Sequence, residues 1–490
     1  MDPMLPVAVV VLVVVFGLCL LNLLKRKKGP RRAVSRNPDD RPIWSAGGVP
    51  ILTKRTLNQG VLVTGQTGSG KSSGVIHNLL RAIMRAGYGM CLIAAKPGDA
   101  KGYLRLASEC GRDDTVVLDR SNQHRLALFD TLLRIDETPA TLAALGQSGL
   151  EVISEVITKK QGHSGEDATF WAGSFQNHSR CMIGAHVMAR VMPSPKALMR
   201  LQNSVPRGVK ELNSTEFKES YCWRLLEMAK AKARGQWEED FATYSDYLLS
   251  TLPRLSEKTR AVVEMMMSNT LSPLLTGVGA DVLASTPTFD LGDLVSNNGI
   301  LICDFPLAQF QQVGQAIGAC VKYLVQLEIM RRKEGKPFVI VVDEAAQYLS
   351  AFDYEYVSIS RSFSGPMVIC LQGVEQLARG EDLTKADVLS GNLATKIACL
   401  PTHRTAAWLS SLVGKHRDYF VGGSVQSGGY EGPFDYGNST ATGSFNEQLT
   451  EIIRPEELYT LRTGGESKLV DALLIASGRP HEFVTFQQQG

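Results

Sequence analysis

The chain has 490 residues, of which 44% are hydrophobic and 21% charged, and its formal net charge is +3. This length is enough for two or three domains. The net charge is too small to make the whole chain strongly acidic or basic, so overall charge indicates no class of binding partner. The nine cysteines form no CxxC pair, and several lie in apolar runs. Their distribution favours a reducing compartment over a disulfide framework.

Residues 4–24 are mostly Val and Leu and carry no charge. A helix of this length spans about 31 Å, which matches a hydrocarbon core of about 30 Å. The basic run KRKKGPRR follows it, so we expect a single transmembrane helix with the bulk of the chain in the cytoplasm. A cleaved signal peptide is the alternative, but its positive charges would precede the apolar run. Residues 25–55 are basic and aperiodic, which predicts a juxtamembrane linker.

The motif GQTGSGKS follows an apolar run at residues 61–63 and precedes a helical pattern at residues 73–86. A strand, a Gly-rich loop and a helix in this order are typical of a phosphate-binding loop, although a chance Gly-rich turn is the alternative. We expect Lys71 to reach the β- and γ-phosphates of ATP, and Ser72 to ligate Mg²⁺. The expected nucleotide-binding residues are Gly65, Gln66, Thr67, Gly68, Ser69, Gly70, Lys71, Ser72 and Ser73.

Strand patterns continue at MCLIAA, which leads into the sequence KPGD at residues 96–99, and at residues 115–118. Helical patterns then extend to about Val191. One of these helices carries His178, Cys181 and His186, but a fourth ligand at sensible spacing is missing. We therefore expect these side chains to pack between helices rather than to bind zinc.

From residue 192 to residue 269 strand patterns vanish and charged helical stretches dominate. This change predicts an inserted all-helical domain, within which Ser256 is a plausible helix N-cap. The insertion would divide a nucleotide-binding domain into a first part at residues 56–191 and a second part at residues 270–490.

Strand patterns return at residues 299–306, and a long helical pattern covers residues 307–332. Four consecutive β-branched residues at 339–342 indicate a strand buried on both faces of a parallel sheet. Further buried strands are expected at residues 366–372 and 395–401. Strands that alternate with helices predict an α/β, doubly wound sheet, in which ligands lie beyond the carboxyl ends of the strands. Four residues with suitable side chains or backbone fall at such ends: Gly65, Lys96, Asp343 and Gln372.

Asp343 and Glu344 end the most apolar strand. In a phosphate-loop enzyme the first acid holds Mg²⁺, and the second can orient or deprotonate the attacking water. Gln372 could hydrogen-bond the γ-phosphate or this water, although a solvent-facing strand end is the alternative. Arg361 could reach the γ-phosphate of a neighbouring subunit if the protein forms a ring, whereas a surface ion pair is the simpler interpretation.

Residues 421–445 are rich in Gly and Ser, which predicts a mobile surface loop, with contact to a neighbouring subunit as the alternative. A helix is expected to begin near Arg454, and the sequence LVDALLIAS predicts a final strand.

Taken together, the phosphate loop, KPGD, VIVVDE, Arg361, LQGVEQL and the stretch GNLATKIACL…LVGKH resemble the type IV secretion coupling proteins. These TraG/TraD-like conjugative DNA-transfer ATPases belong to the FtsK–HerA superfamily. The resemblance extends from the apolar N-terminal segment to the sequence PEEL near Glu456. Two features differ: many members have two transmembrane helices, and many have an Asp-Pro-Lys-Gly run where this chain has KPGD.

The resemblance implies a RecA-like P-loop ATPase sheet with an inserted all-α domain, assembled as a homohexamer at the bacterial inner membrane. It implies ATP and Mg²⁺ as cofactors and DNA, bound with little sequence preference and delivered as a single strand, as substrate. Relaxase or protein effectors and components of the secretion channel would be partners. By the same resemblance Asp343 is the Mg²⁺ acid, Glu344 the catalytic Glu, Gln372 the sensor and Arg361 the residue acting in trans.

Two other functions remain open from the sequence. A DNA partition translocase would use the same motor without a secretion channel. A receptor platform for protein effectors would use hydrolysis for assembly, and its ATPase activity would not respond to DNA.

Overall fold

The computed structural model describes residues 37–133, 137–158, 166–235, 237–284, 286–332, 334–377, 383–426 and 440–489. The expected transmembrane helix at residues 4–24, and most of the expected linker, lie outside these residues. Within the described ranges no helix is long and apolar enough to cross a membrane. The chain divides into two compact units, residues 1–41 and 42–490. The described part of the first unit is a short 3₁₀ turn, η1 (Pro38–Asp40), capped by the side chain of Asn37.

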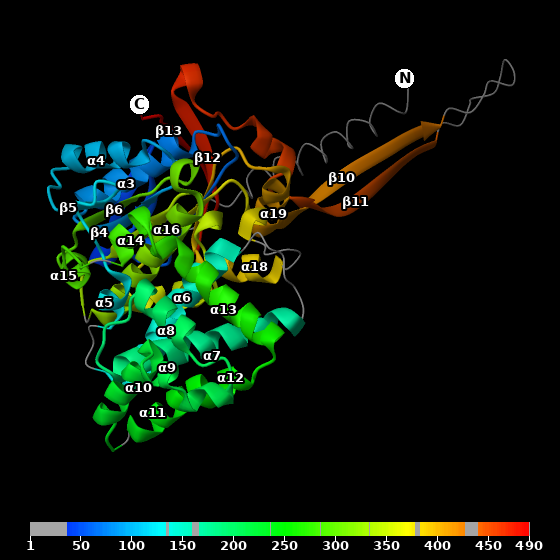
Figure 1. Ribbon diagram of the computed structural model, residues 1–490. Coiled ribbons are helices and arrows are strands. Elements are labelled where there is room, and N and C mark those ends of the chain that lie inside the picture. The colour runs from blue at the N-terminus through cyan, green and yellow to red at the C-terminus, as the bar shows by residue number, and fades with distance from the viewer. Residues whose placement is uncertain are drawn as a thin grey trace, which may run out of the picture. The chain divides into compact units, whose positions relative to one another are not determined.

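The second unit is built on a mixed sheet in which nine of the described strands take part, in the order β13-β12-β9-β3-β8-β7-β4-β6-β5 (Figure 1). Seven of these strands are parallel: β3 (Val61–Thr64), β4 (Gly89–Ala94), β5 (Thr115–Leu118), β6 (Ile300–Asp304), β7 (Phe338–Val342), β8 (Met367–Leu371) and β9 (Thr395–Ala398). Two antiparallel strands, β12 (Leu469–Ala476) and β13 (Glu482–Gln487), extend it beyond β9. The α/β sheet expected from the β-branched runs is therefore confirmed.

Both faces of the sheet are covered, which is why its central strands are buried at every position and almost entirely apolar. One face packs against α3 (His77–Arg85) and α4 (Asp99–Glu109). The other packs against the long helix α16 (Leu307–Arg331), α17 (Ala351–Ile359), α18 (Leu383–Asn392) and a large group of further helices. Within β3, Leu62 faces this second side whereas Val61 and Val63 face the first, as the alternation of a strand requires.

The further helices follow β5 and precede β6, and none of the described residues between these strands lies in a strand. They pack on one another, α7 for example against α6, α10 and α11, and α6 packs against α16. We call them the helical region: α5 (Leu128–Leu132), α6 (Pro139–Thr158), α7 (Glu166–Met188), α8 (Pro195–Ser204), α9 (Thr215–Lys218), α10 (Tyr221–Lys232), α11 (Trp237–Asp246), α12 (Leu252–Arg254), α13 (Glu257–Leu271), α14 (Gly277–Leu283) and α15 (Leu291–Ser296). The expected boundaries of an inserted domain at residues 192 and 269 stay a prediction.

The linker prediction is wrong for residues 42–53. These residues form an antiparallel hairpin of β1 (Pro42–Ala46) and β2 (Val49–Thr53). The hairpin is held by apolar burial, because Leu52 is fully buried and the Trp44 ring stacks on Phe486 of β13 at a centroid distance of 5.1 Å. The short helix α2 (Lys54–Leu57) then leads into β3.

The C-terminal part also differs from the sequence prediction. Both ends of the expected Gly/Ser-rich loop lie in two long paired strands, β10 (Lys415–Gln426) and β11 (Thr440–Glu451), which extend away from the sheet (Figure 1). They follow α19 (His403–Val413). The middle of that expected loop, residues 427–439, lies outside the described residues. The helix expected near Arg454 is a 3₁₀ helix, η10 (Pro455–Thr460). The strand expected to be the last, β12, is followed by β13.

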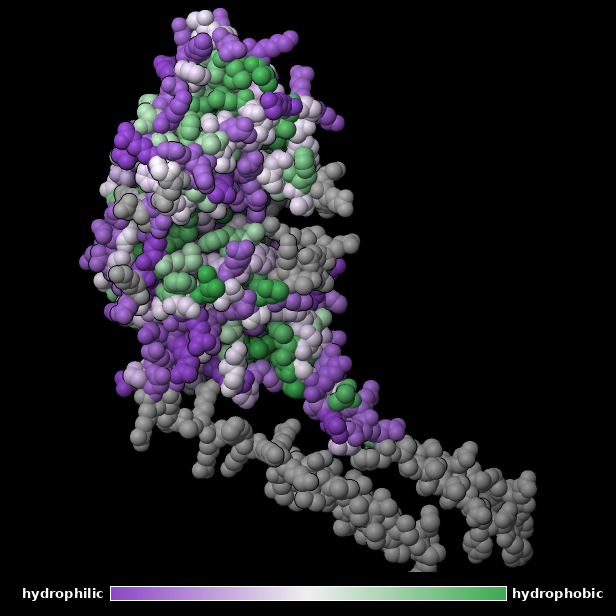
Figure 2. Space-filling view, turned by 90° about the horizontal axis from the view of Figure 1, so that it is seen from below, coloured by the Kyte–Doolittle hydropathy of each residue, from purple (hydrophilic) through white to green (hydrophobic). Residues whose placement is uncertain are grey.

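The surface seen in Figure 2 carries hydrophobic residues in several separate patches among hydrophilic ones. Scattered apolar side chains such as Met228 of α10 and Met265 of α13 are exposed in the helical region. Single exposed apolar residues are ordinary for a soluble surface and do not by themselves mark an interface.

Candidate functional site

The phosphate loop connects β3 to a helical segment that begins as a π-helical turn, η2 (Lys71–Ile76), and continues as α3. Gly68 and Gly70 adopt positive φ angles of 79° and 78°, a conformation that side chains disfavour. The loop is tied to neighbouring strand ends, since the Gly65 N–H donates to the Leu371 carbonyl at 3.2 Å. The glycines therefore serve the curled backbone that the motif predicts.

Inside this loop the structure leaves a hydrogen-bond donor for an anion. The Ser69 side chain packs directly against Gly65, since a Cβ added at Gly65 would lie 2.5 Å from the Ser69 hydroxyl oxygen. The Ser69 hydroxyl is buried and has no hydrogen-bond partner in the described structure. Buried polar groups are normally satisfied, so this orphaned hydroxyl suits a ligand oxygen. Lys71 is buried, and its Nζ donates to the Leu371 carbonyl at 3.0 Å.

Two carboxylates lie at the adjoining end of β7. Asp343 is buried, and its carboxylate accepts the N–H of Glu344 at 2.9 Å. Lys96, which follows β4, lies between them: its Nζ is 3.4 Å from Asp343 Oδ2 and 3.1 Å from Glu344 Oε1. The expected meeting of strand ends thus brings a lysine to the acid pair.

Glu344 and Gln372 contact each other across the ends of β7 and β8. Gln372 Nε2 donates to Glu344 Oε2 at 3.2 Å. Glu344 has a left-handed backbone conformation with φ of 47°, which is uncommon for a residue with a side chain. Such conformations cost roughly 1–3 kcal/mol and persist where surrounding contacts enforce them. At Glu344 these contacts are the bonds to Asp343, Lys96 and Gln372.

The charges at this edge displace the pKa values of their neighbours. Burial alone would raise the pKa of Glu344, but the hydrogen bond and charge of Lys96 hold it below its ordinary value. Burial would lower the pKa of Lys96, but the charge of Asp343 and the hydrogen bond and charge of Glu344 raise it. Both side chains are therefore charged at neutral pH.

Three further groups at or near this edge escaped the sequence analysis. Burial, and next the charge of Asp343, raise the pKa of Asp99 to about 6. Burial also raises the pKa of Asp304 at the end of β6. From the C-terminus, Gln488 Nε2 donates to the Ser73 hydroxyl at 3.1 Å. Asp304 carried a signal, since it ends a predicted strand, whereas the long-range contact of Gln488 had none.

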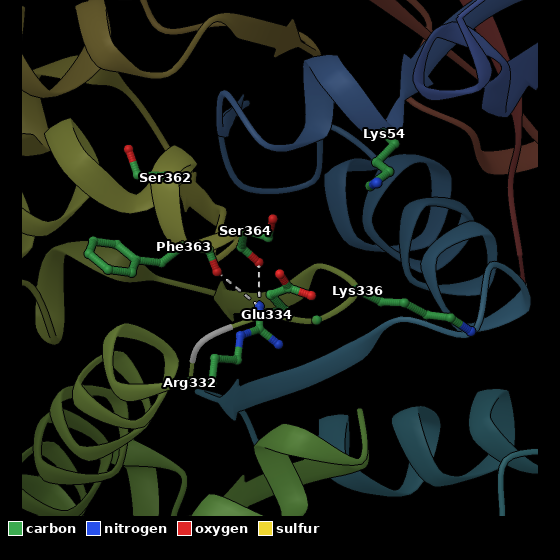
Figure 3. A pocket seen from close by; sticks show the side chains of 8 residues that line it. Lys54, Arg332, Glu334, Lys336, Ser362, Phe363 and Ser364 are labelled. Carbon is green, nitrogen blue, oxygen red and sulfur yellow. Dashed lines mark hydrogen bonds between the residues drawn. The ribbon is translucent and has the colours of Figure 1, made fainter.

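Arg361 lies apart from these groups, on η8 (Ser360–Phe363), which precedes β8, whereas Gln372 follows β8. It is exposed. Figure 3 shows the surroundings of η8: Arg332 Nη2 donates to the Phe363 and Ser364 carbonyls at 3.1 and 2.7 Å, beside a pocket that Lys54 and Lys336 also line. The pocket and η8 lie at the amino edge of the sheet, so Arg361 cannot serve the phosphate loop of its own chain.

The histidines of α7 have protein partners, as the packing interpretation predicts. His178 contacts the Tyr247 hydroxyl at 3.1 Å and Gln202 Oε1 at 3.3 Å. His186 contacts the Met182 carbonyl and the Tyr221 hydroxyl. Among the described residues, no group of three or more His, Cys, Asp and Glu side chains is arranged to hold a metal ion. A Mg²⁺ site of the phosphate-loop kind needs fewer protein ligands, because phosphate and water supply the others.

Comparison with known proteins bears on the fold and on one segment. Residues 337–463, about a quarter of the chain, match the family model for the TraM recognition site of TraD and TraG. Solved structures of the bacterial conjugative coupling protein TrwB share the fold. The unbound form and the complex with ADP and Mg²⁺ each have a TM-score of 0.61 and 14% sequence identity over 93% of this chain and 91% of TrwB.

The predicted resemblance to type IV secretion coupling proteins is confirmed. A third TrwB structure, with a non-hydrolysable ATP analogue, has a TM-score of 0.60 and 15% identity over 91% of this chain and 89% of that one. A search of curated proteins finds no match. The segment that matches the family model, residues 337–463, begins just before β7. It contains Asp343, Glu344, Arg361 and Gln372, whereas the phosphate loop lies outside it.

Proposed function

We propose that this chain is a membrane-anchored ATPase that recruits DNA, or a relaxase–DNA complex, and drives it into a type IV secretion channel. The observation that carries the proposal is the meeting of the phosphate loop with the acid pair. Lys71 is bonded to the last residue of β8, and the next residue, Gln372, is bonded to Glu344. The TraG/TraD family segment and the TrwB fold support the secretion role.

In this proposal residues 65–73 bind the phosphates of ATP, with Lys71 at the β- and γ-phosphates. Ser72 and Asp343 hold Mg²⁺, which neutralises charge on the phosphates when bound. The partnerless Ser69 hydroxyl fits a phosphate oxygen, and solved TrwB complexes hold ADP with Mg²⁺ or an ATP analogue. Glu344 orients or deprotonates the attacking water, and Gln372 bonds this water or the γ-phosphate.

Arg361 would act on a neighbouring subunit. Its exposure and its place at the amino edge of the sheet support a role in trans, within a homohexameric ring. An arginine supplied in this way accelerates phosphoryl transfer by roughly 10³–10⁵ in the enzymes where it is known. Mixed rings of Arg361→Ala and Lys71→Ala subunits should recover hydrolysis, because each subunit completes the site of the other. Inactive rings that are proven to be mixed would contradict the role in trans.

Residues 4–24 would anchor the protein in the bacterial inner membrane by a single pass, with the bulk of the chain in the cytoplasm. The substrate would be DNA bound without sequence preference, as a single strand, together with relaxase or protein effectors. The secretion channel would be the partner that receives it. The TraM recognition-site family of residues 337–463 supports contact with a DNA-processing complex through this segment.

The decisive experiment compares ATP hydrolysis by the full chain and by Lys71→Ala, with and without single-stranded DNA. We expect DNA to stimulate the wild type and Lys71→Ala to lose at least about 10²-fold in turnover, because a positioned charge at the transferred phosphate is lost. Lys101→Ala, an exposed lysine of α4, is the matched control and should behave as wild type. Normal turnover in Lys71→Ala would refute the phosphate-loop assignment, and a wild type indifferent to DNA would refute translocation.

A further inference from the structure

Lys96 contacts both acidic residues of the candidate site. Its amino group contacts Asp343, the proposed Mg²⁺ ligand, at 3.4 Å and Glu344, the proposed catalytic acid, at 3.1 Å. The Lys96 side chain is 47% exposed, whereas those of Asp343 and Glu344 are 3% and 18% exposed. The lysine therefore approaches the acid pair from the solvent side, which is also the side from which a nucleotide would enter.

The backbone of Lys96 is fixed although its side chain is not enclosed. The Lys96 N–H donates to Asp99 Oδ2 at 3.1 Å, and the Asp99 N–H donates to the Lys96 carbonyl at 3.2 Å. Gly98 completes this turn with a φ of 94°. A flexible four-carbon side chain on a fixed turn can exchange one anionic partner for another without a change in the fold.

Mg²⁺ and the Lys96 ammonium group compete for the same ligand. Both bind the carboxylate of Asp343, and two cations on one carboxylate repel each other in a partly buried site. Lys96 and Gln372 also share the carboxylate of Glu344, which leaves that group fewer free lone pairs for a water molecule. The contacts of Lys96 therefore oppose both metal binding and water activation.

We propose that Lys96 is a positioning residue that competes with Mg²⁺ for Asp343 and holds Glu344 until a γ-phosphate draws the lysine away. The inference rests on the proposed function, since it takes ATP as the ligand. The terminal phosphate offers Lys96 a stronger anion than a shared carboxylate. Its arrival would release Asp343 to the metal and Glu344 to the water in one movement, whereas ADP lacks the group that draws Lys96 away.

The test measures binding rather than hydrolysis. Fluorescent ADP and a fluorescent non-hydrolysable ATP analogue are titrated against the full chain over a range of Mg²⁺ concentrations. With ADP, Lys96→Gln should raise the apparent affinity for Mg²⁺ on the order of tenfold, within the usual range of coupling between two ligands. With the analogue the gain should be smaller, and the preference for the analogue over ADP should fall. Lys101→Gln is the matched control.

The outcomes separate the two proposals. If the wild type binds neither nucleotide, the proposed function fails. If the wild type binds both, but the Mg²⁺ dependence with ADP is the same in Lys96→Gln, the competition is refuted and the proposed function stands. Lys96→Arg retains the charge and should keep the weak Mg²⁺ binding of the wild type with ADP. Tight Mg²⁺ binding by Lys96→Arg would overturn the inference even if Lys96→Gln did not fold.

Discussion

Ionisable side chains with displaced pKa values occur both at the carboxyl edge of the sheet and in the helical region, but their surroundings differ. At the carboxyl edge Lys96 and Glu344 face each other and remain in part accessible to solvent. In the helical region His178 and His186 are fully buried, and burial lowers the pKa of each to about 4. Each histidine has a protein partner at both ring nitrogens.

The difference shows that a displaced pKa is not enough to identify a functional site. In the helical region the cause is burial, and the ring nitrogens of both histidines are satisfied by the fold. At the carboxyl edge opposite charges shift the pKa values of Lys96 and Glu344 against the effect of burial, beside a loop with an orphaned hydroxyl. Only the second arrangement has binding capacity left for a ligand.

A buried ion pair tests this distinction, because one of its members, Asp353, lies ten residues after Asp343 and yet is inaccessible to solvent. Lys322 of α16 and Asp353 of α17 form an ion pair with no solvent exposure on either side chain. Asp353 also accepts the Gln326 amide at 2.8 Å and the Ser350 N–H at 2.6 Å. By the comparison above it should behave as a structural group and not as part of the site.

Lys322→Met should therefore give the largest effect on stability. It leaves a buried carboxylate without its counter-charge, which typically costs about 3–5 kcal/mol. Chemical denaturation of the full chain would measure this loss. Lys322→Met combined with Asp353→Asn removes both charges and should recover part of it. A loss below about 1 kcal/mol for the single variant would mean that the ion pair is not fully buried, and the contrast between structural and functional charged groups would fail.

The histidines predict a dependence of stability on pH. Because the folded pKa of about 4 lies below the ordinary value of 6.5, the unfolded chain binds protons first as the pH falls. The contribution of each histidine is intact above pH 6.5 and is lost towards pH 4, with a slope of at most about 1.4 kcal/mol per pH unit.

Thermal unfolding of the wild type and of His178→Gln/His186→Gln between pH 4 and pH 7.5 would measure this slope. The difference between the two proteins is the useful quantity, since Asp99 acts in the opposite direction. Its folded pKa of about 6 lies above the ordinary 3.8, so its contribution to stability falls as the pH rises through that window. Equal slopes in the two proteins would show that the histidines are not buried in neutral form.

Most of the sheet, and the residues of the site, could be predicted from the sequence because they depend on local patterns. Four β-branched residues before Asp343 specify a strand buried on both faces, and the spacing of the phosphate loop is local. The parallel connection then brings Gly65, Asp343 and Gln372 to one edge. The contact of Lys96 with Glu344 was not predictable, because it depends on a side-chain direction set by the left-handed backbone of Glu344.

The missed strands have a common physical origin. In the β1–β2 hairpin, prolines and a Gly-Gly turn interrupt a short apolar alternation whose burial comes from Phe486, more than 400 residues away. β13 follows a turn of a few residues, and its buried positions alternate, but the adjacent apolar residues Phe483 and Val484 blur this pattern in a strand only six residues long. The Gly/Ser-rich ends of β10 and β11, residues 421–426 and 440–445, lack any alternation of apolar residues, so the sequence did not indicate that they pair.

The smallest effect should come from a purely local feature of the helical region. Ser256 caps α13 as the sequence predicts, and its hydroxyl oxygen accepts the Thr259 N–H at 3.1 Å. Ser256→Ala should cost about 1 kcal/mol in unfolding free energy, whereas Ser256→Asp should keep the cap. Ser245→Ala, at a partly exposed serine of α11, is the control and should be neutral or slightly stabilising. Because the Ser256 hydroxyl bonds the first turn of its own helix, nucleotide affinity should not change. A change in nucleotide affinity at constant stability would link α13 to the carboxyl edge and blur the division between the two regions.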